Sequence, residues 1–502
     1  MLERLVTKYG LALHLVLLGV TLFSFLFHRP LAYGISLLWF SLLVIEFLFL
    51  LPSVHTGENY VEARARVASK ILHDPFFFIG IAILLFALCQ MWNSNCALEY
   101  DPIAGVWQMS APPSKGLPFS VSSPFSHFTF FVLLACFVTG LALRDAVSKG
   151  GKRLVVNNFA IISGLVAFYF VLQVFLGREL TLFSGTSVLT PGDGFAARFV
   201  RSTGGQMMGA TFGFWAILSF GCYLESYRHH CSSLMRFCLL FFGIVSNLTA
   251  AVLYLNTAFA LTVLLVAFLL LIYSAVFISG MDNGLACFRF VFFVIPCLAA
   301  VWALATYVVP DNPLREKIQF LQNGDYKAEF SAWNESRELR QNAALQIWQD
   351  HPWRGVGVNG FKHYVGLILD RDDEDLDRRK RAQRYTKSWK IIRKNQNLVF
   401  NDYYQTLCEY GLLGTGLFLA ALICFLIPIG DQMRLLFTRE NGQTKFGFFE
   451  ISPMCWAGVP AILLVGAGAW FGSPLHSQTL LLSWVVLLAA FPGFLPAKKG
   501  VS

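Results

Sequence analysis

The residues that could take part in chemistry are concentrated in the polar stretch between Tyr307 and Leu398 and in the turn that follows it. This stretch interrupts a chain that otherwise consists of apolar runs with short connections. It contains a candidate helix around Arg337, the sequence HPWRGVGVNGF, and the sequence FNDYYQTLCEYGLLG, which enters the next apolar run. If the protein is an enzyme, we expect its active site in this region.

Four arginines lie beside predicted membrane spans, namely Arg178, Arg198, Arg201 and Arg337. A planar guanidinium can bind a phosphate through two parallel hydrogen bonds, so such a group suits the diphosphate of a lipid-linked substrate. The alternative is that each arginine reaches out of the membrane to contact lipid phosphates. Both interpretations remain open for the group.

Residues 355–360 spell GVGVNG, which has the spacing GxGxxG of a dinucleotide-binding turn. That motif requires a preceding strand and a following helix within a βαβ unit. Here the preceding sequence is DHPWR at the end of a candidate helix, so we reject a nucleotide site. The sequence instead predicts a helix that stops at Pro352 and is followed by a flexible glycine turn.

The histidines and cysteines show no metal-binding spacing. Neither His351 nor His363 has a second ligand four residues away, and the eleven cysteines form no CxxC pair. His127 and His476 each lie near the end of a predicted span, where we expect them to be interfacial. We therefore expect no metal and no cofactor.

Composition indicates a polytopic α-helical membrane protein. The chain has 502 residues, of which 56% are hydrophobic and 14% are charged, whereas a soluble chain carries about 25% charged residues. Apolar runs of about 20 residues recur along it, as membrane-spanning helices require. We count about twelve spans, at approximately 10–28, 31–52, 75–93, 126–143, 155–177, 206–225, 236–254, 257–279, 287–309, 399–430, 453–472 and 476–495.

These spans divide the chain into three parts: spans 1 to 9 within residues 1–309, a polar segment at 310–398, and spans 10 to 12 within 399–502. One apolar run, 236–279, is twice as long as a span needs, and we break it at residues 255–257, its most polar point. The run at 399–430 is also too long, so we expect its first turns to lie at the membrane interface.

The basic residues predict the orientation. With both termini in the cytoplasm, the loops rich in Lys and Arg fall inside, as the positive-inside rule requires. The segments 94–125, 178–205 and 310–398 then share the outer face. The net charge of +9 is explained by cytoplasmic loops and anionic headgroups, so we expect a lipid bilayer and no nucleic acid as partner.

The outer segments differ in their predicted structure. Prolines and aromatic residues fill 94–125, which predicts a folded loop without long helices. In the third segment we expect a helix at about 331–350, with an apolar stripe of Leu339, Ala343 and Ile347. A second helix is expected at about 372–393, where acid-before-base pairs four residues apart are typical of a solvated, charged helix.

Three sequence motifs follow one another in the order in which they occur in a known family. They are Arg337, then DHPWRGVGVNGF at residues 350–361, then Asn401 with nine residues before GLLG at 411–414. Glu409 falls where EYGLLG begins. This text resembles the O-antigen ligase and O-antigen polymerase superfamily, whose late periplasmic segment has an arginine, a DHPLxGVGxGxF type of phrase, and His-Asn nine residues before GxxG.

The resemblance implies transfer of a glycan from an undecaprenyl-diphosphate carrier to an acceptor hydroxyl. This would take place at the periplasmic face of the bacterial inner membrane, in surface polysaccharide or lipopolysaccharide synthesis. Arg337, with Arg198 and Arg201 as our additions, would bind the diphosphate, and Asn401 would orient the acceptor. Arginines that stabilise the leaving diphosphate would make a metal unnecessary.

The chain departs from this family at the position where the family has its expected catalytic base. The ligases have a histidine before the asparagine, but this chain has Phe400, which cannot accept a proton. His363 and Glu409 are the candidate substitutes. The family's SRGA phrase also corresponds to LNTA at 255–258, which lacks the arginine.

Two other functions compete with glycan transfer. One is a catalytically degenerate member of the same family that binds lipid-linked glycan or scaffolds polysaccharide assembly, which the missing histidine favours. The other is a transporter, which the scarcity of ionisable residues inside the spans disfavours.

Overall fold

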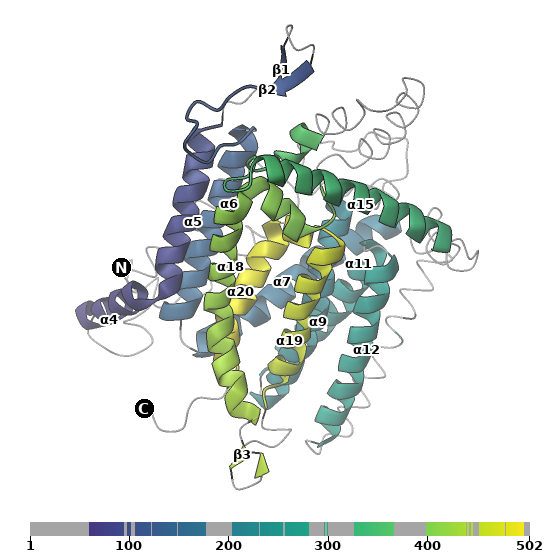
Figure 1. Cartoon of the computed structure of the whole chain (residues 1–502). Coiled ribbons are helices and arrows are strands. Elements are labelled where there is room, and N and C mark those ends of the chain that lie inside the picture. Colours follow the sequence, from purple (N-terminus) through teal and green to yellow (C-terminus); the bar gives the residue numbers. More distant parts are fainter. Residues whose placement is uncertain are drawn as a thin grey trace.

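The computed structural model shows a bundle of long helices with one helix lying across its end (Figure 1). The structure describes residues 60–94, 98–101, 106–121, 123–147, 149–176, 203–229, 231–254, 257–280, 326–365, 398–437, 439–440, 443–444, 451–476 and 478–495, with the single positions 296 and 299. Arg178, Arg198 and Arg201 and the expected helix at 372–393 lie outside this range.

The elements follow one another along the chain in the order shown in Figure 1. They are α4 (Tyr60–His73), α5 (Pro75–Trp92), β1 (Leu98–Asp101), β2 (Val106–Met109), α6 (Ser123–Leu141), η2 (Ala142–Ala146), α7 (Lys149–Leu176), α9 (Thr203–Arg228), α10 (Ser233–Cys238), η3 (Leu239–Ser246), α11 (Asn247–Tyr254), α12 (Thr257–Gly280), α15 (Tyr326–Asp350), α18 (Asp402–Phe437), β3 (Arg439–Glu440), β4 (Gln443–Thr444), α19 (Pro453–Phe471), η4 (Pro474–His476), α20 (Gln478–Ala490) and η5 (Phe491–Gly493).

The two ends of the bundle are different in construction. We call the end crossed by α15 the α15 end (Figure 1). Helices α5 and α19 end there, at Trp92 and Phe471, α18 begins there at Asp402, and η4 packs against these last two helices. The opposite end, which contains Asp74 and Arg144, we call the Asp74 end. Two antiparallel hairpins are the only strands in the part of the chain that the structure describes: β1 pairs with β2, from Leu98 opposite Met109 to Asp101 opposite Val106, and β3 pairs with β4.

Five of the described helices are long and apolar enough to cross a membrane: Pro75–Trp92, Phe125–Ala146, Ser233–Leu253, Asp402–Asp431 and Pro453–Phe471. Shorter apolar helices cover Thr262–Val276 and Leu480–Gly493. The protein is thus a helical membrane protein. The expected spans 10–28 and 31–52 lie outside the described range, as does most of 287–309, so a total of about twelve stays a prediction.

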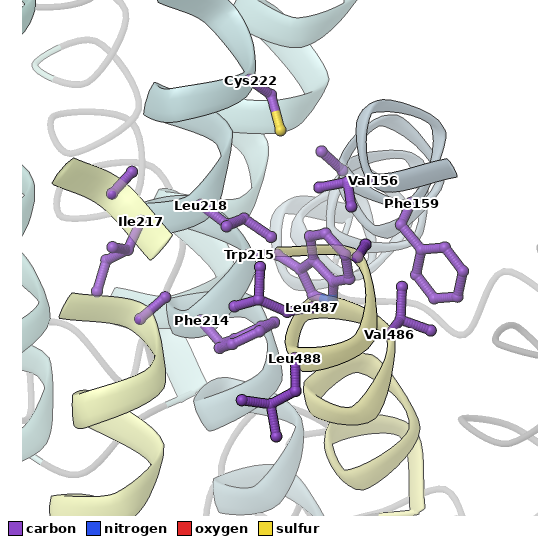
Figure 2. Close-up of a cluster of buried hydrophobic side chains, with 14 of the residues drawn as sticks. Val156, Phe159, Phe214, Trp215, Ile217, Leu218, Cys222, Val486, Leu487 and Leu488 are labelled. Carbon is purple, nitrogen blue, oxygen red and sulfur yellow. The ribbon is translucent and has the colours of Figure 1, made fainter. Parts of the chain in front are cut away.

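Helix α9 forms the centre of the bundle, packed against α7, α11, α12 and α19. Its Trp215 is fully buried, stacks on Phe159 of α7 with ring centroids 5.3 Å apart, and donates its indole N–H to Ser483 Oγ of α20 at 3.1 Å. Figure 2 shows the ring beside Phe159, Val486 and Leu487. A membrane bundle gains cohesion from such close packing and interhelical hydrogen bonds rather than from expulsion of water.

Several local predictions are confirmed. The long apolar run breaks as expected, because α11 ends at Tyr254 and α12 begins at Thr257. The helix expected at 331–350 is α15, and its stripe of Leu339, Ala343 and Ile347 packs in a small core at the α15 end. The described part of 94–125 holds the β1–β2 hairpin and a loop without long helices.

An ion pair closes the Asp74 end. Arg144 of η2 donates Nε to Asp74 Oδ2 at 2.7 Å, Nη2 to Asp74 Oδ1 at 3.0 Å and Nη1 to the Cys424 carbonyl of α18 at 2.6 Å. Asp74 also caps α5 by accepting from Phe76 N at 3.0 Å. One guanidinium therefore joins α5, η2 and α18 at this end of the bundle.

Candidate functional site

The start of α18 is broken at Gly411, and the glycine loop that follows α15 fills the break. Gly411 has φ of 63° and ψ of −168°, which no helix contains. Beyond the break, the N–H groups of Leu412 and Leu413 donate to the carbonyls of Pro352 and Trp353 at 2.8 and 3.1 Å. These are donors that a new helix start leaves without helical partners.

The same loop satisfies the other side of the break. The carbonyls of Cys408 and Glu409 accept from Val356 N at 3.0 Å and from Gly357 N at 2.8 Å. Four backbone hydrogen bonds thus connect the two segments reciprocally. The sequence GVGVNG is therefore neither a nucleotide site nor the flexible glycine turn that we expected, because its backbone groups are used to hold α18.

Two glycines allow this close approach. A side chain at Gly355, where φ is 64°, would place its Cβ 2.5 Å from the backbone of Glu409. A side chain at Gly411 would place its Cβ 2.5 Å from the backbone of Arg354 and Trp353. Positive φ and the absence of space both require glycine here. The first turns of α18 are in this way positioned rigidly beneath α15.

Two arginines of α15, one turn apart, face the segment that leads into α18 and the end of α19. Arg340 is 1% exposed; its guanidinium lies 4.7 Å from the Phe400 ring centre and donates Nη1 to the Leu398 carbonyl at 3.0 Å. Arg337, which is 9% exposed, lies 5.2 Å from the ring centre of Phe471. Cations over aromatic faces are stabilised by the ring quadrupole.

Both arginines keep their charge. Burial lowers the pKa of Arg340 to about 10, and burial also lowers the pKa of Arg337, so each remains protonated at neutral pH. The sequence singled out Arg337 but missed Arg340. Its spacing of three residues from Arg337 could have identified it, because residues i and i+3 share one helix face.

Asn401 caps α18. Its Oδ1 accepts from Tyr403 N at 3.0 Å and Tyr404 N at 3.3 Å, as an N-cap side chain does. The residue is fully buried, and within the described range its Nδ2 has no hydrogen-bond partner. Phe400, just before it, has φ of 58°. The amide group is thus held by its oxygen and presents its N–H donors.

His476, which comes from the η4 turn between α19 and α20, meets the start of α18. Its Nδ1 lies 2.6 Å from Asp402 Oδ1, and its Nε2 lies 3.9 Å from Glu409 Oε2. Asp402 Oδ2 also accepts from Leu475 N at 2.8 Å. Glu409 Oε1 accepts from Gln405 Nε2 at 3.0 Å. The imidazole therefore lies between two carboxylates.

The environment of His476 favours its charged form. Burial by itself lowers the pKa of His476, but the hydrogen bond to Asp402 and the negative charges of Asp402 and Glu409 outweigh it and raise the pKa to about 10. Two carboxylates that are almost fully buried require such a partner, because an unpaired buried charge is strongly unfavourable. The resting imidazole is protonated at neutral pH.

The structure brings some of the expected site residues together. Arg337, Asn401 and Glu409 all lie at the α15 end, and Tyr404 is close enough to Arg337 to affect its pKa. His363 is exposed in the short helix at 361–365 that follows the glycine loop, where its backbone N–H donates to the Gly360 carbonyl at 2.9 Å. Asp402 and Gln405 were not expected at the site, and His476 was expected only at the membrane interface.

Comparison with known families adds a decisive observation. Residues 233–419 match the family model described as O-antigen ligase. This match supports the resemblance of the chain to the O-antigen ligase superfamily. The match runs from α10 into α18, so the O-antigen ligase domain includes Arg337, Arg340, Asn401 and Glu409, whereas His476 follows it. No curated protein matches the chain.

The O-antigen ligase domain supports a ligase-like or polymerase-like role in surface polysaccharide synthesis. It also implies a lipid-linked glycan and a bilayer as the context of the reaction. The α15 end brings together two cations, a buried amide and a titratable imidazole, on segments that backbone hydrogen bonds connect.

Proposed function

We propose that this protein transfers a glycan from an undecaprenyl-diphosphate carrier to an acceptor hydroxyl at its α15 end. The observation that carries the proposal is the pair of buried guanidinium groups, Arg337 and Arg340, placed against the α18 start inside an O-antigen ligase domain. In this proposal the α15 end is periplasmic, and both chain termini are cytoplasmic.

The chemistry of transfer explains why cations are needed. The acceptor oxygen attacks the anomeric carbon, the bond to the diphosphate breaks, and the electron pair remains on the diphosphate. Guanidinium groups that are already in place stabilise that developing negative charge. Arg337 and Arg340 fill this role in our proposal, with Arg198 and Arg201 as further diphosphate ligands. The Asn401 amide donates to the acceptor.

A second candidate function is a degenerate family member that binds lipid-linked glycan without transferring it. Phe400 favours this candidate, because a phenyl ring stands where the ligases have their histidine. Donor binding and turnover must therefore be measured separately.

The test uses the full chain in lipid vesicles. The donor is an undecaprenyl-diphosphate oligosaccharide, and the acceptor is a glycolipid fraction from cells in which the gene for this chain is deleted. Release of undecaprenyl diphosphate reports turnover, and co-sedimentation of labelled donor with the vesicles reports binding. The proposal expects both. Binding without turnover would establish the degenerate function instead.

One substitution tests whether Arg337 binds the donor. Arg337→Ala is expected to weaken donor binding, because it removes a buried cation from the diphosphate site. Lys362→Ala removes an exposed cation at the same end and serves as the control. Equal donor binding by the two variants would remove Arg337 from the site.

A further inference from the structure

The proposed function leaves one feature of the site unexplained. A histidine that lies beyond the matched residues 233–419 packs against the start of α18. His476 lies far along the chain from α18, yet its imidazole contacts Asp402, which is two residues after Phe400. The protein therefore has an imidazole in space close to the position where its sequence lacks one.

We propose that His476 is the catalytic residue that takes the proton from the acceptor hydroxyl, with Asp402 and Glu409 as positioning residues. This inference rests on the proposed glycan transfer and assigns its missing base. Nε2 of the neutral imidazole accepts the hydroxyl proton while the acceptor oxygen bonds to the anomeric carbon. The diphosphate leaves with its electron pair, and the imidazolium later gives the proton to water.

The two ring nitrogens have different surroundings, which assigns their roles. Nδ1 is engaged at 2.6 Å by Asp402, an arrangement that fixes the ring and its tautomer. Nε2 is 3.9 Å from Glu409 Oε2, too far for a direct hydrogen bond. In our proposal the acceptor hydroxyl donates its single proton to Nε2, since Nδ1 is already engaged by Asp402.

Exposure also favours the imidazole over the two carboxylates as the group that meets an acceptor. The His476 side chain is 26% exposed, whereas Asp402 and Glu409 are 2% and 1% exposed. The carboxylates therefore lie behind the ring, and the ring is the part of this group that an incoming acceptor can reach. A candidate base has to reach the proton that it removes.

A purely structural role for the same contact has to be distinguished. Asp402 also binds the Leu475 N–H, so the contact anchors η4 to α18 even without catalysis. An anchor predicts lower stability when it is removed. It does not predict a shift in the pH dependence of transfer, whereas a base does.

The charges around His476 make the pH test specific. Of the elements packed against η4, α18 presents Asp402 and Glu409, while α19, α20 and the adjoining part of α9 carry no titratable side chain near it. Below the pKa of His476, transfer is expected to rise about tenfold per pH unit, because only the neutral ring accepts a proton. Glu409→Gln and Asp402→Asn each remove a charge that raises this pKa, so each moves the rising limb to lower pH.

The experiment uses the vesicles, donor and acceptor fraction described above. His476→Asn keeps a side-chain N–H for Asp402 but cannot accept a proton, and it is expected to lose about 10²–10⁴-fold in undecaprenyl diphosphate release while binding donor normally. His127→Asn, which changes another histidine near the same end, is the matched control. The pH profiles of Glu409→Gln and Asp402→Asn carry the test even if His476→Asn does not fold.

Three results would overturn the assignment. The first is transfer by His476→Asn at the wild-type rate. The second is a pH profile of transfer by Glu409→Gln whose rising limb lies at the wild-type pH. The third is loss of transfer in His363→Asn but not in His476→Asn. A wild-type chain that does not turn over the donor, whether or not it binds it, would instead overturn the proposed transfer, and with it this inference. Turnover by the wild type therefore separates the two failures.

Discussion

The two ends of the bundle each join helices through a buried aspartate, but they use different cations. At the Asp74 end the partner is the guanidinium of Arg144, which makes two hydrogen bonds to Asp74 and one to Cys424. At the α15 end the partner of Asp402 is the imidazole of His476. A guanidinium does not lose its proton in proteins, whereas an imidazole does. The first contact can only hold the helices, and the second can also exchange a proton.

The substitution with the largest expected effect on stability is Arg144→Met. It leaves Asp74, whose side chain is 5% exposed, as a buried carboxylate without its cation, and breaking such a pair costs about 3–5 kcal/mol. Thermal unfolding in detergent would measure the loss. The pH profile of transfer by the remaining folded protein should be unchanged. A shifted profile would mean that the two ends are not separate in function.

Next in size is Gly411→Ala. The backbone at residue 411 has positive φ, which an alanine adopts only with strain. The new Cβ would also lie 2.5 Å from the backbone of Trp353 and Arg354, so the glycine loop must separate from α18. Backbone strain of this kind costs about 1–3 kcal/mol. We expect lower unfolding temperature together with loss of transfer. Gly416→Ala is the control, because a Cβ there meets nothing within 4 Å. Equal behaviour of the two variants would contradict the docking of the loop.

A smaller effect is expected from Arg340→Lys. The substitution keeps the charge but removes the planar group that lies over Phe400 and donates to Leu398. Hydrogen bonds of charged groups contribute about 1.5–3 kcal/mol, so donor binding should weaken by roughly ten- to a hundredfold if the guanidinium also holds the diphosphate. Co-sedimentation with labelled donor measures this. Unchanged affinity would leave Arg340 with the structural contact alone.

A last prediction concerns the pH dependence of stability. The pKa of His476 in the folded protein, about 10, is above its usual value of 6.5. The stability that His476 contributes is therefore fully present below pH 6.5 and is lost as the pH rises through 10. Unfolding temperatures of the wild type and His476→Asn should differ most at the acid end of this window. A difference in unfolding temperature that grows with pH would contradict the protonated state assigned to His476.

The sequence predicted those parts of the protein that depend on local pattern. Runs of apolar residues predicted the membrane helices, and the polar point at 255–257 predicted the break between α11 and α12. The stripe of Leu339, Ala343 and Ile347 predicted α15 and the face that it buries. Each of these follows from the fixed repeat of a helix and from the cost of placing polar groups in lipid.

The family resemblance also came from the sequence, because Arg337, the glycine loop and Asn401 stand in a characteristic order. The order of these residues does not state what each one does. The glycines were expected to form a flexible turn, and the structure shows them bonded to the backbone of α18. Hydrogen bonds between two irregular segments have no periodic signature, so this role could not be predicted from the chain alone.

The candidate site itself was decided by tertiary structure. Asp402 and His476 are separated by the whole α18–α19 hairpin, and only its packing brings their side chains to 2.6 Å. Read alone, Phe400 indicated a ligase without its base. The sequence by itself determined a helical membrane protein with a segment that matches the O-antigen ligases, because those properties are local. Tertiary structure decided which imidazole meets which carboxylate, because that depends on how helices far apart in the chain pack together.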